Sequence, residues 1–178
     1  MGFLDLVRVR HTTRSFLPNP VEREKIERCL EAARLAPSAC NGQPWRFIVV
    51  ESHSLKNKIA EQAFSGAYKM NSFAVKAPVI VAVVTLPTKA AASFAGFFRR
   101  LSYPLIDIGI ACEHFVLQAT EEGLGTCWIG WFNEGAVKNS LSIPRSERVH
   151  ILLCVGYSEK DSNGFKNRKK MIEMSEYR

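Results

Sequence analysis

The spacing of apolar residues near the start of the chain predicts two helices. The first is expected over residues 3–11. The second shows an apolar stripe at helical spacing, formed by Ile26, Cys29, Leu30 and Ala33. Asn19 is suited to cap this helix, and Pro20 is suited to its first position, where no backbone N–H is needed. The pattern therefore predicts that the second helix begins at residue 20.

Runs of β-branched and other apolar residues further along the chain predict four short strands. These strands are expected over residues 47–50, 78–85, 126–131 and 149–155. The run 78–85 is nearly continuous in valine and isoleucine, a pattern typical of a strand that is buried on both faces. We therefore expect both faces of this strand to be covered.

The segments between the strands predict helices over residues 54–64, 103–122 and 133–141. The helix over 103–122 has too many apolar positions for one narrow stripe, so it is expected to serve a subunit interface as well as the core. Gly123 is expected to cap its end. Residues 89–101 fit a lid or a short helix over a pocket. The last residues, about twenty in number, fit an arm that docks on another surface.

Composition narrows the class of protein. The 178 residues suit one domain, and no apolar run reaches the roughly 18 residues that would indicate a membrane span. The start of the chain becomes charged too soon for a signal peptide. Five cysteines, an odd number without Cys-x-x-Cys spacing, favour reduced and mostly buried thiols over disulfides or a zinc site. We therefore expect a single domain over residues 1–178, with no membrane partner, in the cytoplasm.

The net charge of +7 and the isoelectric point near 9.3 raise the question of a nucleic-acid partner. The basic residues form short, separate clusters within residues 8–14, 99–100 and 166–170. No basic stripe with interleaved aromatic residues accompanies them, and no helix-turn-helix, zinc-finger or RNA-binding signature is present. A phosphate on a cofactor explains two of these clusters more economically. A basic nucleic-acid- or partner-binding protein without enzymatic activity stays the alternative.

Two polar segments carry the candidate chemistry. In Arg10-His11-Thr12-Thr13-Arg14, two guanidinium groups that converge on one helical face would offer forked donors to a phosphate. In Pro37-Ser38-Ala39-Cys40-Asn41-Gly42-Gln43-Pro44-Trp45, the first proline ends a helix, and the serine and asparagine carry short side chains that bond backbone or ligand. The pairing suits an anion joined to a planar polar ring. Dinucleotide and P-loop glycine motifs, histidines at metal-ligand spacing and a Ser-His-Asp arrangement are not apparent.

These two segments resemble the opening of the FMN-dependent nitroreductase family, which reads as a basic "RHST(K/R)" cluster and then "PS…N.QPW.F.VV". The likeness continues in the same order through Asp107-Ile108-Gly109, residues 123–132, Pro144, residues 149–157 and residues 166–170. The resemblance implies an α+β fold with a central, mostly antiparallel sheet flanked by helices. It also implies a homodimer with exchange of the C-terminal arms and two flavin sites at the subunit interface.

The same resemblance assigns residues to bound FMN. The phosphate and its surroundings are assigned to Arg10, His11, Thr12, Arg14, Lys166 and Arg168. The isoalloxazine and ribityl groups are assigned to Pro37, Ser38, Ala39 and Asn41. Ile129 and Gly130 are expected to bring backbone against the ring, with an amide at its reactive nitrogen. Ile129 stands where some members of the family have a carboxylate, so a side-chain hydrogen bond from that position is missing here.

The activity implied by the resemblance is that of an FMN oxidoreductase. NADH or NADPH, as a transient donor, gives a hydride to the flavin, and an electron-poor acceptor such as a nitroaromatic or quinone takes it in the same cleft. Such a ping-pong cycle leaves the hydride chemistry to the cofactor, so no catalytic acid or base and no metal are expected among the side chains. The acceptor pocket is expected to be open and shaped by residues 64–73 and 94–98.

Overall fold

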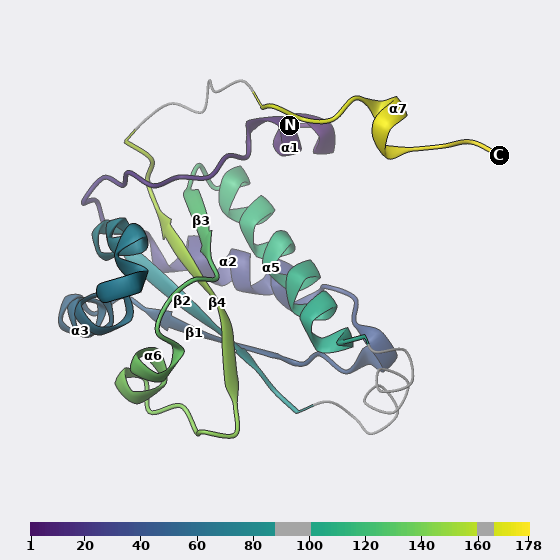
Figure 1. Cartoon of the computed structure of the whole chain (residues 1–178). Helices are drawn as coiled ribbons and strands as arrows, with labels where there is room; N and C mark the ends of the chain where they lie inside the picture. Colours follow the sequence, from purple (N-terminus) through teal and green to yellow (C-terminus); the bar gives the residue numbers. More distant parts are fainter. Residues whose placement is uncertain (88–100, 160–165) are drawn as a thin grey trace.

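The computed structural model describes residues 1–87, 101–159 and 166–178 (Figure 1). Its centre is a four-stranded sheet in the order β1-β2-β4-β3, in which every neighbouring pair is antiparallel. The strands are β1 Trp45–Val50, β2 Val79–Thr85, β3 Gly125–Ile129 and β4 Arg148–Gly156. This arrangement, with helices on the sheet, confirms the predicted α+β fold. The third strand ends at residue 129 instead of residue 131.

Strand β2 is buried on both faces, as its valine-rich sequence predicts. Alternate side chains of a strand point to opposite faces of the sheet. Ile80, Ala82 and Val84 therefore belong to one apolar cluster, which contains buried residues of α3 (His53–Ala63) and α6 (Glu134–Ser140). The residues between them belong to a second cluster with α2 (Arg23–Arg34) and α5 (Tyr103–Glu121). The sheet is thus covered by one pair of helices on each face.

The remaining elements are short: α1 Phe3–Val9, the 3-10 segments η1 Ala39–Asn41 and η2 Gly66–Lys76, and α7 Met171–Met174. The sequence pattern did not predict η2 or α7. Residues 88–100 lie outside the described part of the chain, so the expected lid falls almost entirely there. Among the described residues, no helix is both long enough and apolar enough to cross a bilayer.

Both N-terminal helices differ from their predicted bounds. Helix α1 ends at Val9, because the chain turns extended at Arg10 and pairs with β3 through a parallel bridge between Thr12 and Thr126. Arg10 and Arg14 therefore do not share a helical face. Helix α2 begins at Arg23 after Glu22, not at residue 20. The prolines at positions 18 and 20 disfavour helical backbone before them, and residues 15–17 instead pair with residues 157–159.

Helix α5 ends as predicted at a glycine. Gly123 has a φ of +76°, and the N–H of Leu124 donates to the carbonyl of Ala119 over 2.8 Å, the bond of a Schellman motif. At the other end of this helix, Leu105 and Ile106 are 46% and 45% exposed. The helix therefore presents uncovered apolar side chains near its start, although most of its length is packed in the core.

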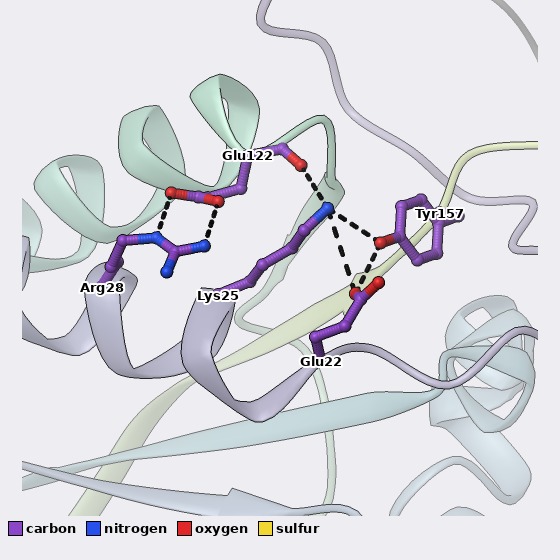
Figure 2. Close-up of polar contacts among 5 residues, drawn as sticks. All are labelled: Glu22, Lys25, Arg28, Glu122 and Tyr157. Carbon is purple, nitrogen blue, oxygen red and sulfur yellow. Dashed lines mark hydrogen bonds and ion pairs between the residues drawn. The ribbon is translucent and has the colours of Figure 1, made fainter.

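Five polar residues join α2 to the ends of α5 and β4 (Figure 2). Arg28 binds Glu122 through two hydrogen bonds, of 2.6 and 2.7 Å. The ammonium group of Lys25 donates to the main-chain oxygen of Glu122 at 3.0 Å and to the Tyr157 hydroxyl at 2.9 Å. That hydroxyl donates in turn to Glu22 over 2.6 Å. The network fixes the N-terminal half of α2 against the C-terminal ends of α5 and β4.

Candidate functional site

Basic residues from the two ends of the chain meet beside α1. Arg10 is the C-cap residue of this helix, and the ammonium group of Lys166 donates to the carbonyl of Val7 over 2.6 Å. Burial, together with the positive charges of Arg10 and Arg168, lowers the pKa of Lys166. The structure thus gathers three of the predicted phosphate-binding residues, although 156 positions separate Arg10 from Lys166 in the sequence.

The basic cluster has no ion-pair partner among the described residues, although Glu113 of α5 lies near enough to oppose the lowering of the Lys166 pKa. In the part of the chain that the structure describes, no carboxylate lies within ion-pair distance of Arg10, Arg14, Lys166 or Arg168. Arg14 lies near β3, where its charge partly offsets the burial that raises the pKa of the Cys127 thiol. Cations that gather without anions repel one another, so the cluster is suited to an anionic ligand.

His11 and Thr12 take different positions between these arginines. The two ring nitrogens of His11 lie 3.3 Å from the carbonyl oxygen of Val9 and 3.1 Å from the hydroxyl of Thr13. Thr13 is fixed in turn, since its N–H donates to the Thr126 carbonyl over 2.8 Å. His11 therefore braces the backbone of the segment, whereas the side chain of Thr12 is exposed. A glycine is needed opposite, because a Cβ on Gly125 would lie 2.3 Å from the Thr13 hydroxyl oxygen.

The second predicted segment forms a tight turn over residues 38–43. Cys40, Asn41 and Gln43 all have left-handed backbone, with φ of 53°, 50° and 45°. The turn is closed by the N–H of Gln43, which donates to the Ser38 hydroxyl at 2.9 Å, and by the Gln43 amide, which donates to Asn41 at 3.0 Å. Strained backbone of this kind is concentrated at ligand-binding sites. Pro37 is exposed and precedes the turn.

Asp107 was not among the predicted site residues. Its carboxylate is 3% exposed and accepts a 3.0 Å hydrogen bond from the N–H of Ala39, at the start of the turn. The available signal in the sequence was one carboxylate inside the otherwise apolar opening of α5. Helical periodicity alone would place a charged residue on the solvent side of the helix. The contact between Asp107 and η1 depends on the tertiary fold.

The end of β3 carries the other two residues that were predicted to contact the flavin ring, Ile129 and Gly130. The carbonyl of Thr126 faces the N-terminal segment, and successive residues of an antiparallel strand direct their main-chain groups to alternate sides. The amide of Ile129 therefore faces β4, and its side chain is only 2% exposed. Gly130 follows with its main chain exposed, and a Cβ placed on it would meet no atom within 4 Å. The register thus favours the amide of Gly130 over that of Ile129 as the ligand contact.

An exposed aromatic residue borders this glycine. The Trp131 side chain is 56% exposed, yet its indole N–H donates to the carbonyl of Ala67 at 3.1 Å. Its own carbonyl accepts from the Asn71 side chain at 2.8 Å, and its ring lies 5.2 Å from that of Tyr68. These contacts bring part of the predicted segment 64–73 next to Gly130. Residues 94–98, the other predicted wall of the pocket, lie outside the described residues.

The N-terminal segment and the turn at residues 38–43 both lie along α5. Val9 and His11 line the same small cavity, of about 130 Å³, as Thr120 near the C-terminal end of α5. The turn at residues 38–43 is bound to Asp107 near the other end of this helix (Figure 1). Thirteen residues of α-helix, from 107 to 120, measure about 20 Å. The cavity and the turn therefore lie toward opposite ends of α5, and Lys166 of the basic cluster is within electrostatic range of Glu113, which lies between them on the helix.

Comparison with known proteins identifies the class of protein that this fold and site define. The model of the Nitroreductase family matches residues 7–157 of the chain. The chain belongs to this family, and membership places it among oxidoreductases.

Individual relatives agree with this assignment. A crystal structure of a nitroreductase family protein from Clostridium novyi NT is 37% identical, with a TM-score of 0.79, over 92% of this chain and 91% of that chain. A Streptococcus pyogenes protein with the provisional name NAD(P)H nitroreductase Spy0809 is 30% identical over 89% of this chain and 91% of its own length. A provisionally named nitroreductase from Exiguobacterium sibiricum 255-15, solved in complex with FMN, shares the fold at 22% identity, with a TM-score of 0.81, over 100% of this chain and 98% of that chain.

The matches also extend to other reactions. The 5,6-dimethylbenzimidazole synthase of Rhodobacter capsulatus is 28% identical over 87% of this chain and 83% of its own length. Family membership by itself therefore does not select the acceptor.

Proposed function

We propose that the protein is an FMN-dependent oxidoreductase that transfers a hydride from NAD(P)H to an electron-poor acceptor such as a nitroaromatic or a quinone. The observation that carries the proposal is the basic cluster of Arg10, Lys166 and Arg168, none of which has a carboxylate within ion-pair distance among the described residues; Arg14, which also has none, is proposed to join it. Gly130 supports it, because the space beside this exposed glycine leaves room for a flat ring against the main chain. The FMN complex of the Exiguobacterium protein supports the choice of this cofactor.

The residues of the chain would bind and orient the cofactor. Forked guanidinium donors from Arg10 and Arg14, with the charges of Lys166 and Arg168, would hold its phosphate. The Gly130 amide would donate to the reactive edge of its ring. FMN, when bound, supplies the hydride chemistry. Because donor and acceptor would use one cleft in turn, we expect parallel double-reciprocal kinetic lines, the pattern of a ping-pong cycle.

Each complete site would be built from two copies of the chain. The turn at residues 38–43 is bound to Asp107 of α5, whereas the basic cluster lies beside α1, so we expect Ser38, Ala39 and Asn41 to contact FMN that is held by the basic cluster of a second copy. Exposed apolar residues support a homodimer. They include Phe3 and Leu4 on α1, Leu105 and Ile106 on α5, and Met171, Ile172 and Tyr177 in the C-terminal segment. Such a segment, 64–94% exposed at its large apolar residues, suits an arm that packs on the partner.

Titration of the apoprotein with FMN tests the proposed cofactor. We expect saturable binding at one FMN per chain, followed by NAD(P)H oxidation that depends on added quinone. No binding of FMN by the folded apoprotein would contradict the proposal. Salt-dependent binding of duplex DNA in its place would favour the alternative of a nucleic-acid-binding protein.

Two substitutions at one position test the amide of Gly130. Gly130→Ala retains the amide and has room for a methyl group, whereas Gly130→Pro removes the N–H. We expect the alanine variant to retain flavin reduction within about tenfold, a barrier change under roughly 1.4 kcal/mol, and the proline variant to lose far more. Equal rates in two folded, FMN-loaded variants would show that this amide does not contact the reactive edge.

Sedimentation with absorbance detection tests the shared site. If FMN binds only the dimer, dilution should release FMN and dissociate the dimer together, because a ligand of the dimer stabilises it by mass action. A monomer that retains stoichiometric FMN would rule out a site shared between copies.

A further inference from the structure

The turn at residues 38–43 is closed by its own hydrogen bonds but has little to fix it to the fold. Its main-chain bonds run from Asn41 to the Ser38 carbonyl at 3.0 Å and from Gly42 to the Ala39 carbonyl at 2.9 Å. In the described part of the chain, two hydrogen bonds join residues 38–43 to other elements: the N–H of Trp45 in β1 donates to the Gln43 carbonyl at 2.9 Å, and the N–H of Ala39 donates to the Asp107 carboxylate at 3.0 Å. The main-chain bond to β1 holds the end of the turn, and Asp107 is the one described side chain from another element that is hydrogen-bonded to its start.

Asp107 occupies an unusual place for a carboxylate. It is buried in α5 between the exposed Ile106 and the buried Ile108, and no cation is within ion-pair distance of it among the described residues. Burial of such a group costs free energy that an apolar residue would not cost. The hydrogen bond to the turn is its visible compensation.

We infer that Asp107 is a positioning residue of the flavin site: it holds the turn at residues 38–43 in the left-handed conformation that the turn needs in order to contact FMN. The inference rests on the proposed function and extends it to a residue outside the cofactor contacts. Cys40, Asn41 and Gln43 each adopt a backbone that non-glycine residues disfavour. Without an acceptor for the Ala39 N–H, the turn would relax and have to be ordered again when FMN binds.

The exposed neighbours of Asp107 show where this effect would act. Leu105 and Ile106 precede it on the uncovered end of α5, the face proposed to meet the second copy. Asp107 therefore links the turn to the rigid helix at the interface. We expect its loss to be felt at the cofactor bound by the partner's basic cluster, not at the sheet.

The chain offers a matched way to remove either half of the hydrogen bond. Asp107→Ala removes the acceptor, and Ala39→Pro removes the donor. Proline is suited to position 39, because Ser38 already has extended backbone (φ −148°, ψ 156°) and Ala39 opens the 3-10 turn. Asp107→Asn retains an acceptor oxygen. Glu61→Ala removes an exposed carboxylate on α3 and serves as the control.

The experiment titrates each full-length apoprotein with FMN by flavin fluorescence and records the melting temperature without FMN. We expect Asp107→Ala and Ala39→Pro each to weaken FMN binding at least tenfold, and the double variant to bind no more weakly than the weaker single variant. Asp107→Asn should restore binding to within about threefold of wild type, and Glu61→Ala should match wild type.

Two results would overturn the positioning role. One is FMN binding within twofold of wild type in Asp107→Ala, or in Ala39→Pro if the alanine variant does not fold. The other is multiplication of the two single losses in the double variant, which would mean that the residues act separately. Failure of the wild-type apoprotein to bind FMN would instead contradict the proposed function.

Discussion

Two regions of the molecule concentrate basic residues, and they differ in what surrounds the charges. In the network that joins α2 to α5, Arg28 is bound to Glu122, and Lys25 lies between a carbonyl, a hydroxyl and Glu22 (Figure 2). In the basic cluster beside α1, the ammonium group of Lys166 donates only to a carbonyl, and the like charges of Arg10 and Arg168 outweigh the opposite charge of Glu113. The cations of the first region have ion-pair partners, whereas the cations of the second region have none among the described residues.

The difference separates structural cations from binding cations better than net charge does. A total of +7 raised the possibility of nucleic acid, but that number sums paired and unpaired residues alike. Paired residues such as Arg28 have their hydrogen-bond donors occupied and can be explained by helix packing. Unpaired cations that approach one another oppose folding slightly, and their donors are available to an anionic ligand such as the phosphate proposed above.

Removing two unpaired arginines should have the largest effect on binding. We expect Arg14→Ala combined with Arg168→Ala to weaken FMN binding by at least about 100-fold, since each charge-assisted hydrogen bond contributes roughly 1.5–3 kcal/mol. The melting temperature of the apoprotein should stay the same or rise, because like charges are removed. Calorimetric titration with FMN and a thermal melt measure the two quantities.

The control for this experiment comes from a paired arginine. Arg23→Ala removes the same charge from an exposed position that pairs with Glu27, and we expect FMN affinity within about twofold of wild type. Unchanged affinity in the Arg14, Arg168 double variant would remove these residues from the phosphate site.

A substitution in the paired network should have the opposite pattern. Lys25→Met retains an apolar stem but leaves the Glu122 carbonyl and the Tyr157 hydroxyl without their donor. We expect the free energy of unfolding to fall by about 1–2 kcal/mol, with FMN affinity unchanged. Denaturant unfolding of the apoprotein and FMN titration check both parts. A large loss of FMN affinity, with stability retained, would show that the network is not merely structural.

Adding an acid to the basic cluster should make it resemble the paired network. Asn167 is exposed between Lys166 and Arg168 in the sequence. Asn167→Asp therefore adds a carboxylate that can form an ion pair with a neighbouring cation. We expect FMN binding to weaken by about three- to tenfold, while the apoprotein becomes no less stable. Asn167→Ser, which adds no charge, is the control. Equal FMN affinity in the two variants would argue that residue 167 lies away from the phosphate.

The sequence predicts the fold well because its strands and long helices depend on local patterns. The valine-rich run of β2 and the glycine after α5 were both located correctly. Errors arose where a distant segment decides the local structure. Pairing of Thr12 with Thr126 ends α1 early, and pairing of residues 15–17 with residues 157–159 delays α2.

The candidate site shows the same limit. Sequence resemblance assigned Arg10 and Lys166 to one phosphate, and the structure places them near each other, but the resemblance did not show that the Ala39 N–H is bonded to Asp107. It also did not show the direction of the amide at Ile129, which follows from strand register. These properties depend on the side of a strand or on contacts between residues far apart in sequence, which composition and spacing do not encode.

The smallest expected effect is a difference between the two regions in how the melting temperature depends on pH. The hydrogen bond from Arg28 holds the pKa of Glu122 below its usual value of 4.5, although burial opposes this. A lowered carboxylate pKa stabilises the folded state above pH 4.5, and this stabilisation is lost as the pH falls through the folded-state pKa. Below pH 4.5, wild type should therefore lose melting temperature more steeply than Glu122→Gln.

Lys166 should respond at the opposite end of the pH scale. Its pKa lies below the usual 10.5, because burial and the neighbouring arginines disfavour its charge. The charged form therefore destabilises the folded apoprotein at neutral pH, and this cost is relieved as the pH rises through the folded-state pKa towards 10.5. Relative to Lys166→Met, the wild-type apoprotein should gain melting temperature over that interval. Bound FMN should abolish the gain, because a phosphate beside Lys166 favours the ammonium form. Parallel melting curves for wild type and Lys166→Met, with and without FMN, would mean that Lys166 neither experiences the arginines nor meets the phosphate.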